Sequence, residues 1–131
     1  MNLLKELFGK IIITKEVEDE FMGDLPDFFQ IQNPKDPNYH KILSTFLDKG
    51  EASVIALALE LENCLLIIDE AKGRKEAKAM GIRITGTLGL MILAKEKNLI
   101  RELKPILNQI HNTNFRISRS LIEKALKIVG E

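Results

Sequence analysis

Hydrophobic and polar residues follow two patterns along the chain, and these patterns predict strands and helices in alternation. Short runs of β-branched and other apolar residues, bounded by polar residues, are typical of buried strands. Longer stretches with apolar residues three and four positions apart are typical of helices. The predicted strands are residues 10–14, a brief edge strand at 28–32, 65–68 and 82–85. The predicted helices are residues 15–22, 39–47, 51–62, 71–80, 87–97, 100–111 and 118–129.

This alternation indicates an α/β fold, because successive β–α units pack as a parallel sheet covered by helices. Residues 51–62 are apolar nearly all round, which is typical of a buried helix. The chain has 131 residues and contains no long linker, repeat or low-complexity segment. That length is near the common size of one domain. We therefore expect a single domain over residues 1–131.

Charge is distributed unevenly along a chain whose formal net charge is zero. The 19 Lys and Arg balance the 19 Asp and Glu, and a hydrophobic content of 45% excludes a disordered tail. Residues 1–70 hold 6 basic and 14 acidic residues, a net charge of −8. Residues 71–131 hold 13 basic and 5 acidic residues, a net charge of +8. Zero net charge is therefore compatible with an acidic half that holds cations and a basic half that faces phosphates.

The composition argues against several other kinds of site. The single Cys64 allows no internal disulfide and no multi-cysteine zinc site, and its apolar neighbours predict a buried, unreactive thiol. His40 and His111 are far apart in sequence, which argues against a histidine metal site or a Ser-His-Asp triad. The apolar runs are too short to span a bilayer and no leader segment opens the chain, so we expect a cytoplasmic protein without membrane association.

Acidic residues stand where a parallel sheet would gather them at one edge. Asp69 and Glu70 directly follow one predicted strand, three acids at 18–20 follow another, and Glu51 opens the buried helix. Ligands of open parallel sheets bind beyond the carboxyl ends of the strands. Clustered carboxylates repel one another unless a cation neutralises them, and Mg²⁺ prefers oxygen ligands. Such an ion can polarise a phosphoryl oxygen and ready a water for attack.

Each of these acids also has a purely structural interpretation. Asp48 and Glu51 have the spacing of an N-cap residue and its partner in a capping box, which would employ Glu51 at the helix start. Asp69 has the position of an N-cap for the helix that begins near residue 71. At least one of the three acids at 18–20 is expected to lie on a solvated face.

Three stretches of the chain form a specific run of motifs. They are LDKGEASVIALALEL at 47–61, LLIIDEAKGRKEAKAMG at 65–81 and ITGTLGLMILAKEKNL at 84–99. In this order and spacing they resemble the PIN-domain proteins, in particular a prokaryotic subgroup related to the toxin ribonucleases of toxin–antitoxin pairs. Residues 3–9, 12–21 and 115–118 are also similar to that subgroup, so the resemblance covers essentially the whole chain.

The resemblance implies a three-layer α/β/α fold whose short, mostly parallel sheet is flanked by helices. It also implies hydrolysis of RNA phosphodiester bonds that depends on Mg²⁺ or Mn²⁺ held by clustered carboxylates. Glu20, Glu51 and Asp69 match acids of the family pattern, which makes them the expected catalytic and metal-binding residues. Glu70 stands where the subgroup often has a further acid, and we expect it to be auxiliary.

The chain departs from the family pattern at the start of the sheet. Relatives begin with a central strand that ends in an Asp, the first metal-coordinating acid, and continue into a helix like LLKELFG at residues 3–9. Met1 matches a position inside that helix, so we expect the strand and its Asp to be missing and the sheet to contain a gap. Three explanations stay open: the native start lies elsewhere, the chain is a degenerate member, or oligomerisation covers the gap.

Four basic residues on the predicted helix after Asp69 are expected to bind RNA. They are Lys72, Arg74, Lys75 and Lys78. Cations beside an acidic pocket hold the nucleic-acid backbone, although lysines on a helix face often do no more than solvate it.

The leading hypothesis is therefore a metal-dependent, PIN-like ribonuclease. One alternative is a catalytically inactive PIN-like module that binds RNA or a protein partner such as an antitoxin. Another is an interaction domain that forms a homodimer through the apolar surface left by the gap in the sheet.

Overall fold

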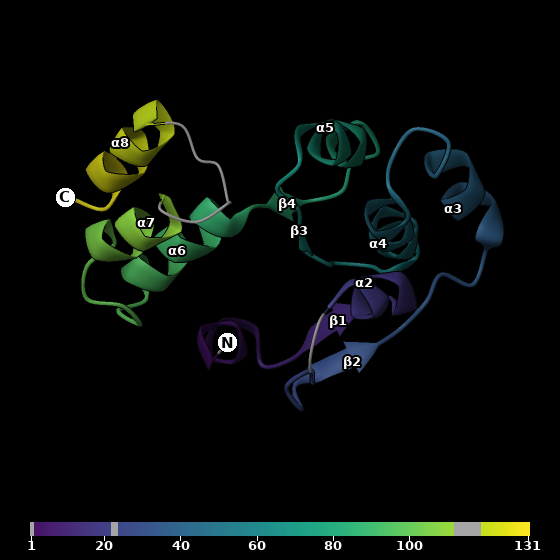
Figure 1. Ribbon diagram of the computed structural model, residues 1–131, viewed down its shortest axis with the longest axis horizontal. Helices are drawn as coiled ribbons and strands as arrows, with labels where there is room; N and C mark the ends of the chain where they lie inside the picture. The colour runs from purple at the N-terminus through teal and green to yellow at the C-terminus, as the bar shows by residue number, and fades with distance from the viewer. Residues whose placement is uncertain (1, 22–23, 112–118) are drawn as a thin grey trace. The chain divides into compact units, whose positions relative to one another are not determined.

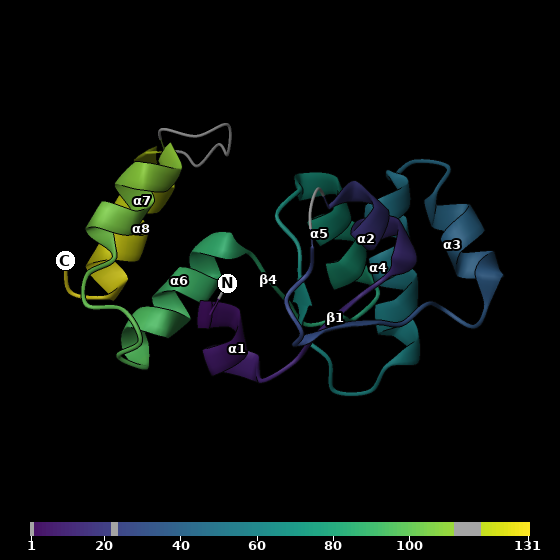
Figure 2. The same cartoon turned by 60° about the horizontal axis from the view of Figure 1, so that its bottom comes forward.

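The computed structural model describes residues 2–21, 24–111 and 119–131, which form two compact units (Figures 1 and 2). The first unit ends at Gly86 and contains α1 (Asn2–Phe8), β1 (Ile11–Ile13), α2 (Lys15–Glu20), β2 (Phe29–Ile31), α3 (Pro37–Leu43), α4 (Lys49–Glu60), β3 (Leu66–Ile67), α5 (Ala71–Ala79) and β4 (Ile84–Thr85). The second unit contains α6 (Thr87–Glu96), α7 (Lys104–His111) and α8 (Arg119–Ile128). Among the described residues, no helix combines the length and the apolar character that a membrane span requires.

The four strands form two separate sheets, each made of two parallel strands. β1 pairs with β2, with Ile11 opposite Phe29, and β3 pairs with β4, with Leu66 opposite Ile84. The prediction of an α/β fold with short parallel sheets and flanking helices is confirmed. β1 and β3 do not pair with each other in the described part of the chain.

Helix α4 is the central element of the first unit, and it contacts α2, α3, α5 and β3 (Figure 1). Ala52, Ile55 and Ala56 of this helix are buried in the main core. They pack with side chains from α3 and the turn after it, β3 and α5, namely Leu43, Leu47, Leu66, Ile68 and Ala77. The nearly continuous apolar sequence of α4 therefore reflects neighbours on several sides, as predicted for a buried helix.

Two helices have one end that differs from the pattern-based prediction by about four residues. α3 ends at Leu43 rather than near residue 47, because residues 44–46 form a tight turn in which the Phe46 N–H donates to the carbonyl of Leu43. α7 begins at Lys104 rather than near residue 100. The carboxylate of Glu131 accepts from the N–H groups of Leu103 and Lys104, at 2.8 and 3.3 Å, and so caps the first turn of α7.

The thiol of Cys64 is half-buried rather than fully buried, and it donates to the carbonyl of Ala58 at 3.7 Å. The family-like segment at residues 115–118 lies outside the described residues.

A chain of hydrogen bonds joins the end of β1 to the first turn of α4. The hydroxyls of Thr14 and Ser53 are fully buried and lie 2.6 Å apart. Ser53 donates to the carbonyl of Gly50 at 2.7 Å, and Thr14 accepts from the N–H of Val17 at 3.3 Å as the N-cap of α2. The Ser53 hydroxyl uses its proton on the carbonyl of Gly50, so in the bond between the two hydroxyls Thr14 donates and Ser53 accepts. All three hydrogen bonds then form at once.

Replacing Ser53 by alanine should therefore destabilise the first unit. Ser53→Ala removes two hydrogen bonds and leaves the buried hydroxyl of Thr14 without its acceptor, which costs about 1–3 kcal/mol. Urea denaturation measures this loss, with Ser44→Ala as control because Ser44 is an exposed serine at the end of α3. The control should change stability by less than about 0.5 kcal/mol. Equal effects of the two substitutions would contradict the prediction.

Candidate metal centre

Three carboxylates meet where α4 begins and β3 ends. They belong to Asp48, Glu51 and Glu70, and one oxygen of each lies within 4.8 Å of the others. Asp48 is the N-cap of α4, and its Oδ1 accepts from the N–H of Glu51 at 2.8 Å. Glu70 follows β3 and is the N-cap residue of α5, but its side chain makes no capping hydrogen bond. The predicted cap at Asp48 is thus confirmed, and it brings a second carboxylate beside Glu51.

Glu51 is in an unfavourable environment for a negative charge. Its Oε2 is buried and has no hydrogen-bond partner within the described part of the chain. Burial is the largest of the effects that raise the pKa of Glu51 to about 8, and the neighbouring Asp48 and Glu70 add to it. A divalent cation would give Oε2 a partner and offset the repulsion, since hard cations take carboxylate oxygens as ligands. The three residues therefore fit Mg²⁺ or Mn²⁺.

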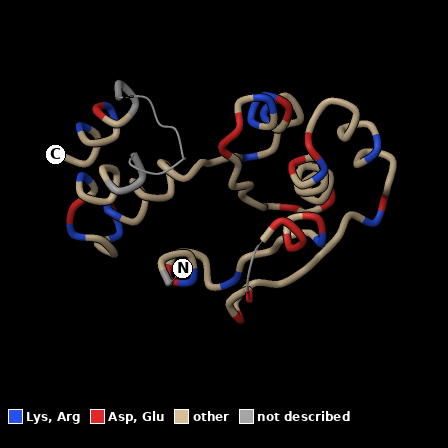
Figure 3. The backbone as a smooth tube through the Cα atoms, in the orientation of Figure 1, with Lys and Arg blue, Asp and Glu red and all other residues tan. Residues whose placement is uncertain are grey.

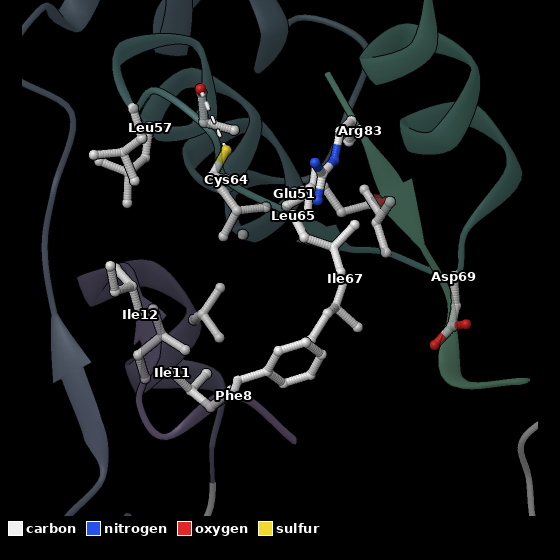
Figure 4. Close-up of a pocket in the computed structure, with 18 of the residues that line it drawn as sticks. Phe8, Ile11, Ile12, Glu51, Leu57, Cys64, Leu65, Ile67, Asp69 and Arg83 are labelled. Carbon is white, nitrogen blue, oxygen red and sulfur yellow. Dashed lines mark hydrogen bonds between the residues drawn. The ribbon is translucent and has the colours of Figure 1, made fainter. Parts of the chain in front are cut away.

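All four acids predicted from the sequence line one groove of the first unit, together with Asp48. Glu51 and Glu70 belong to the acidic cluster, whereas Glu20 and Asp69 lie outside it. Figure 4 shows the Asp69 carboxylate apart from that of Glu51. Successive side chains of an extended segment point to opposite sides, which accounts for Glu70 but not Asp69 lying beside Glu51.

Asp48 is the member of the cluster that sequence reasoning did not include as a ligand. The spacing of Asp48 and Glu51 by itself predicts a helix cap. The same spacing places both side chains on the first turn of the helix, which is a usable signal for a shared ligand.

The acids at 18–20 have different roles. Lys15 forms ion pairs with Glu18 and with Asp19, each at 3.0 Å, and the Asp19 side chain is 62% exposed. The expectation that at least one of these acids lies on a solvated face is confirmed. The carboxylate of Glu20 instead lies against the backbone of Gly50, at the start of α4.

Three glycines leave room for three of the acidic side chains. A Cβ atom at Gly50 would lie 2.6 Å from Oε1 of Glu20. At Gly73 it would lie 2.6 Å from Oε2 of Glu51, and at Gly86 it would lie 2.7 Å from Oδ1 of Asp69. All three distances are shorter than real Cβ contacts, so any side chain at these positions would displace its acid.

The basic residues of α5 divide into two groups. Nη1 of Arg74 donates to the carbonyl of Ile68 at 2.8 Å, so this guanidinium holds the end of β3 beside Asp69. Lys72, Lys75 and Lys78 are exposed on α5, where Figure 3 shows basic residues gathered. A positive helix surface thus follows directly after the acidic cluster in the chain.

A family model described as a PIN domain matches residues 1–131. The chain belongs to the PIN-domain family. No curated protein and no solved structure matches it. Membership of the PIN family and the acidic cluster together point to nuclease-type chemistry. The family match covers both compact units of the PIN chain.

Alanine at Gly50 and at Gly73 should have opposite effects on stability. Both positions are helical, where alanine is favoured over glycine by about 1 kcal/mol. At Gly50 the new Cβ meets only the flexible end of Glu20, so Gly50→Ala should leave stability unchanged or raise it. At Gly73 it also meets Cδ1 of buried Ile68 at 2.5 Å, so Gly73→Ala should lower stability by about 1–3 kcal/mol. Thermal denaturation compares the two variants. Equal changes in Tm would be evidence against the close contact between Gly73 and Ile68.

The raised pKa of Glu51 should make stability depend on pH. Because this pKa is about 8 in the folded chain and 4.5 ordinarily, the folded state binds the proton more tightly. That contribution to stability is fully present below pH 4.5 and is lost as the pH rises through about 8. Glu51→Gln imitates the protonated form, so the original chain should lose stability relative to this variant over that range. Urea denaturation in EDTA measures the free energy of unfolding of both chains as a function of pH. If the two curves run parallel, the pKa of Glu51 is not raised by folding.

Proposed function

We propose that this PIN-domain chain is a metal-dependent ribonuclease that hydrolyses phosphodiester bonds in RNA. The observation that carries the proposal is the buried, unpartnered Oε2 of Glu51 within a cluster of three carboxylates. Asp48, Glu51 and Glu70 would hold Mg²⁺ or Mn²⁺. Glu20 and Asp69 line the same groove and add negative charge to it.

When bound, a divalent cation polarises a phosphoryl oxygen and lowers the pKa of a water that attacks phosphorus. The chain contributes the ligands and the electrostatic setting for that chemistry. Glu51 keeps its proton at neutral pH and releases it when it becomes a ligand, so cation affinity increases as the pH rises toward 8. Gly73 and Gly86 leave room for the carboxylates of Glu51 and Asp69, and Arg74 fixes the strand end from which Asp69 and Glu70 extend.

The lysines of α5 supply the attraction for the substrate. Lys72, Lys75 and Lys78 are exposed on the helix that starts immediately after Glu70. Cations in this position bind the phosphate backbone of RNA independently of base sequence. These lysines support a nucleic-acid substrate, and single-stranded or structured RNA is the substrate that we propose.

Divalent metal should stabilise the original chain and support cleavage of RNA. At a metal concentration a hundredfold above Kd, a single site adds about 2.7 kcal/mol to the free energy of unfolding. Glu51→Gln should abolish that gain and slow cleavage of an end-labelled RNA by roughly a hundredfold, or about 2.7 kcal/mol in activation free energy. Glu62→Gln is the matched control, because Glu62 is exposed and lies outside the groove lining.

The proposed enzymatic function is contradicted if excess Mn²⁺ neither raises the free energy of unfolding nor supports cleavage of the RNA. Salt-dependent RNA binding without cleavage would instead favour an RNA-binding module, which the position of Glu20 and Asp69 outside the cluster supports as the second candidate. An antitoxin partner, a homodimer and a cytoplasmic location stay predictions from the sequence.

A further inference from the structure

Arg74 lies in a different environment from the lysines of α5. Lys72, Lys75 and Lys78 are exposed, whereas Arg74 is half-buried. Its side chain extends from the first turn of α5 toward the ends of β3 and β4, and its Nη1 donates to the carbonyl of Ile68 at 2.8 Å. Arg74 is therefore not one of the cations that solvate the surface of this helix.

Arg74 holds the chain on both sides of Asp69. Its side chain bonds to the carbonyl of Ile68, which belongs to the peptide group that leads into Asp69. Its backbone N–H donates to the carbonyl of Glu70 at 2.9 Å. The N–H of Ile68 donates to the carbonyl of Thr85 at 2.8 Å, so pairing with β4 fixes the chain only as far as Ile68. Beyond that point, the two bonds of Arg74 limit the directions in which the side chains of Asp69 and Glu70 can extend.

The guanidinium and the Asp69 carboxylate meet at Gly86. A Cβ atom at this position would lie 2.7 Å from Oδ1 of Asp69, 3.0 Å from Nη1 of Arg74 and 3.5 Å from the carbonyl oxygen of Ile68. The three atoms therefore surround the same bare Cα. Glu70, the next residue of this extended segment, joins the acidic cluster instead. The contacts of Arg74 thus coincide with the point where the two neighbouring acids diverge.

A positive charge near a cation site has two opposite effects on the affinity for the cation. Coulomb repulsion disfavours the cation, so a guanidinium that acted only as a charge would weaken the site. Hydrogen bonds that orient the ligands strengthen the site, and removing such a group typically lowers metal affinity by about 10–100-fold. Mg²⁺ requires a nearly ideal octahedral arrangement, whereas Ca²⁺ accepts irregular ones. Loss of an orienting residue should therefore affect Mg²⁺ more than Ca²⁺.

We propose that Arg74 is the positioning residue of the candidate metal centre and raises its affinity for Mg²⁺ more than its affinity for Ca²⁺. By holding the chain on both sides of Asp69, it directs Glu70 into the acidic cluster. The gain from ligand geometry exceeds the Coulomb repulsion of its own charge. This inference rests on the proposed function, because it concerns the same cation site.

Calorimetric titration of the full chain with Mg²⁺ and with Ca²⁺ tests the proposal without RNA. Arg74→Met keeps an unbranched stem and removes the donors and the charge, so Mg²⁺ should bind about tenfold more weakly and Ca²⁺ less than about threefold more weakly. Arg74→Lys keeps the charge and an N–H donor without the planar guanidinium, so it should recover part of the Mg²⁺ affinity. Lys72→Met is the matched control, because it removes an exposed charge from the same helix and should leave both affinities unchanged or slightly higher.

Binding of cations to the original chain distinguishes this proposal from the proposed function. If the original chain binds no Mg²⁺, the positioning role is overturned, and if it also binds no Mn²⁺, the proposed function fails with it. If the original chain binds Mg²⁺ and Arg74→Met binds it equally or more tightly, Arg74 is only a nearby charge and the positioning role alone is overturned. Equal losses for Mg²⁺ and Ca²⁺ also overturn it, because they indicate a general loss of structure.

Circular dichroism checks that each variant folds. If Arg74→Met does not fold, Arg74→Lys carries the test, and it should bind Mg²⁺ about threefold more weakly than the original chain while Ca²⁺ binding is unchanged. Equal Mg²⁺ affinity of Arg74→Lys and the original chain then overturns the proposal.

Discussion

The first unit depends on the buried hydrogen-bond chain that runs from Thr14 through Ser53 to the carbonyl of Gly50. Both hydroxyls are inaccessible to water, so losing either partner leaves a buried polar group unpaired, which proteins rarely tolerate. This chain fixes the end of β1 and the start of α2 against the first turn of α4. The strand β3 is held against the same helix through the apolar core around Ile55 and Ile68. β1 and β3 are thus attached to α4 through separate sets of contacts.

The predictions that succeeded were those that local sequence determines. The apolar residues of α4 identify a buried helix, and the spacing of Asp48 and Glu51 identifies its cap, because both effects act within a few residues. The α/β class follows from alternating patterns that repeat along the chain. The start of α7 could not be predicted in this way, because Glu131, more than twenty residues away, supplies its cap.

The candidate site was predicted in part, and its geometry explains the difference. Asp69 and Glu70 are adjacent in sequence, and only the direction of each side chain decides which one joins Glu51. A pattern of acids at strand ends contains no information on that direction when the strand is two residues long. Asp48 was identified by its structural role, and a residue that caps a helix with one oxygen can still offer carboxylate charge to a cluster. The glycines that accommodate the acids are recognisable only once the packing of α5 and of residue 86 is known.

The groove and the acidic cluster are physically coupled because Glu51 and Glu70 line the groove at the end where the strands finish. Burial is the main cause of the raised pKa of Glu51, so a negative charge on this side chain costs free energy. The cost is offset when Glu51 keeps its proton or when a cation neutralises the cluster. A proton and a divalent cation therefore offset the same cost at Glu51 in two alternative ways, so cation binding releases the proton and each weakens the binding of the other.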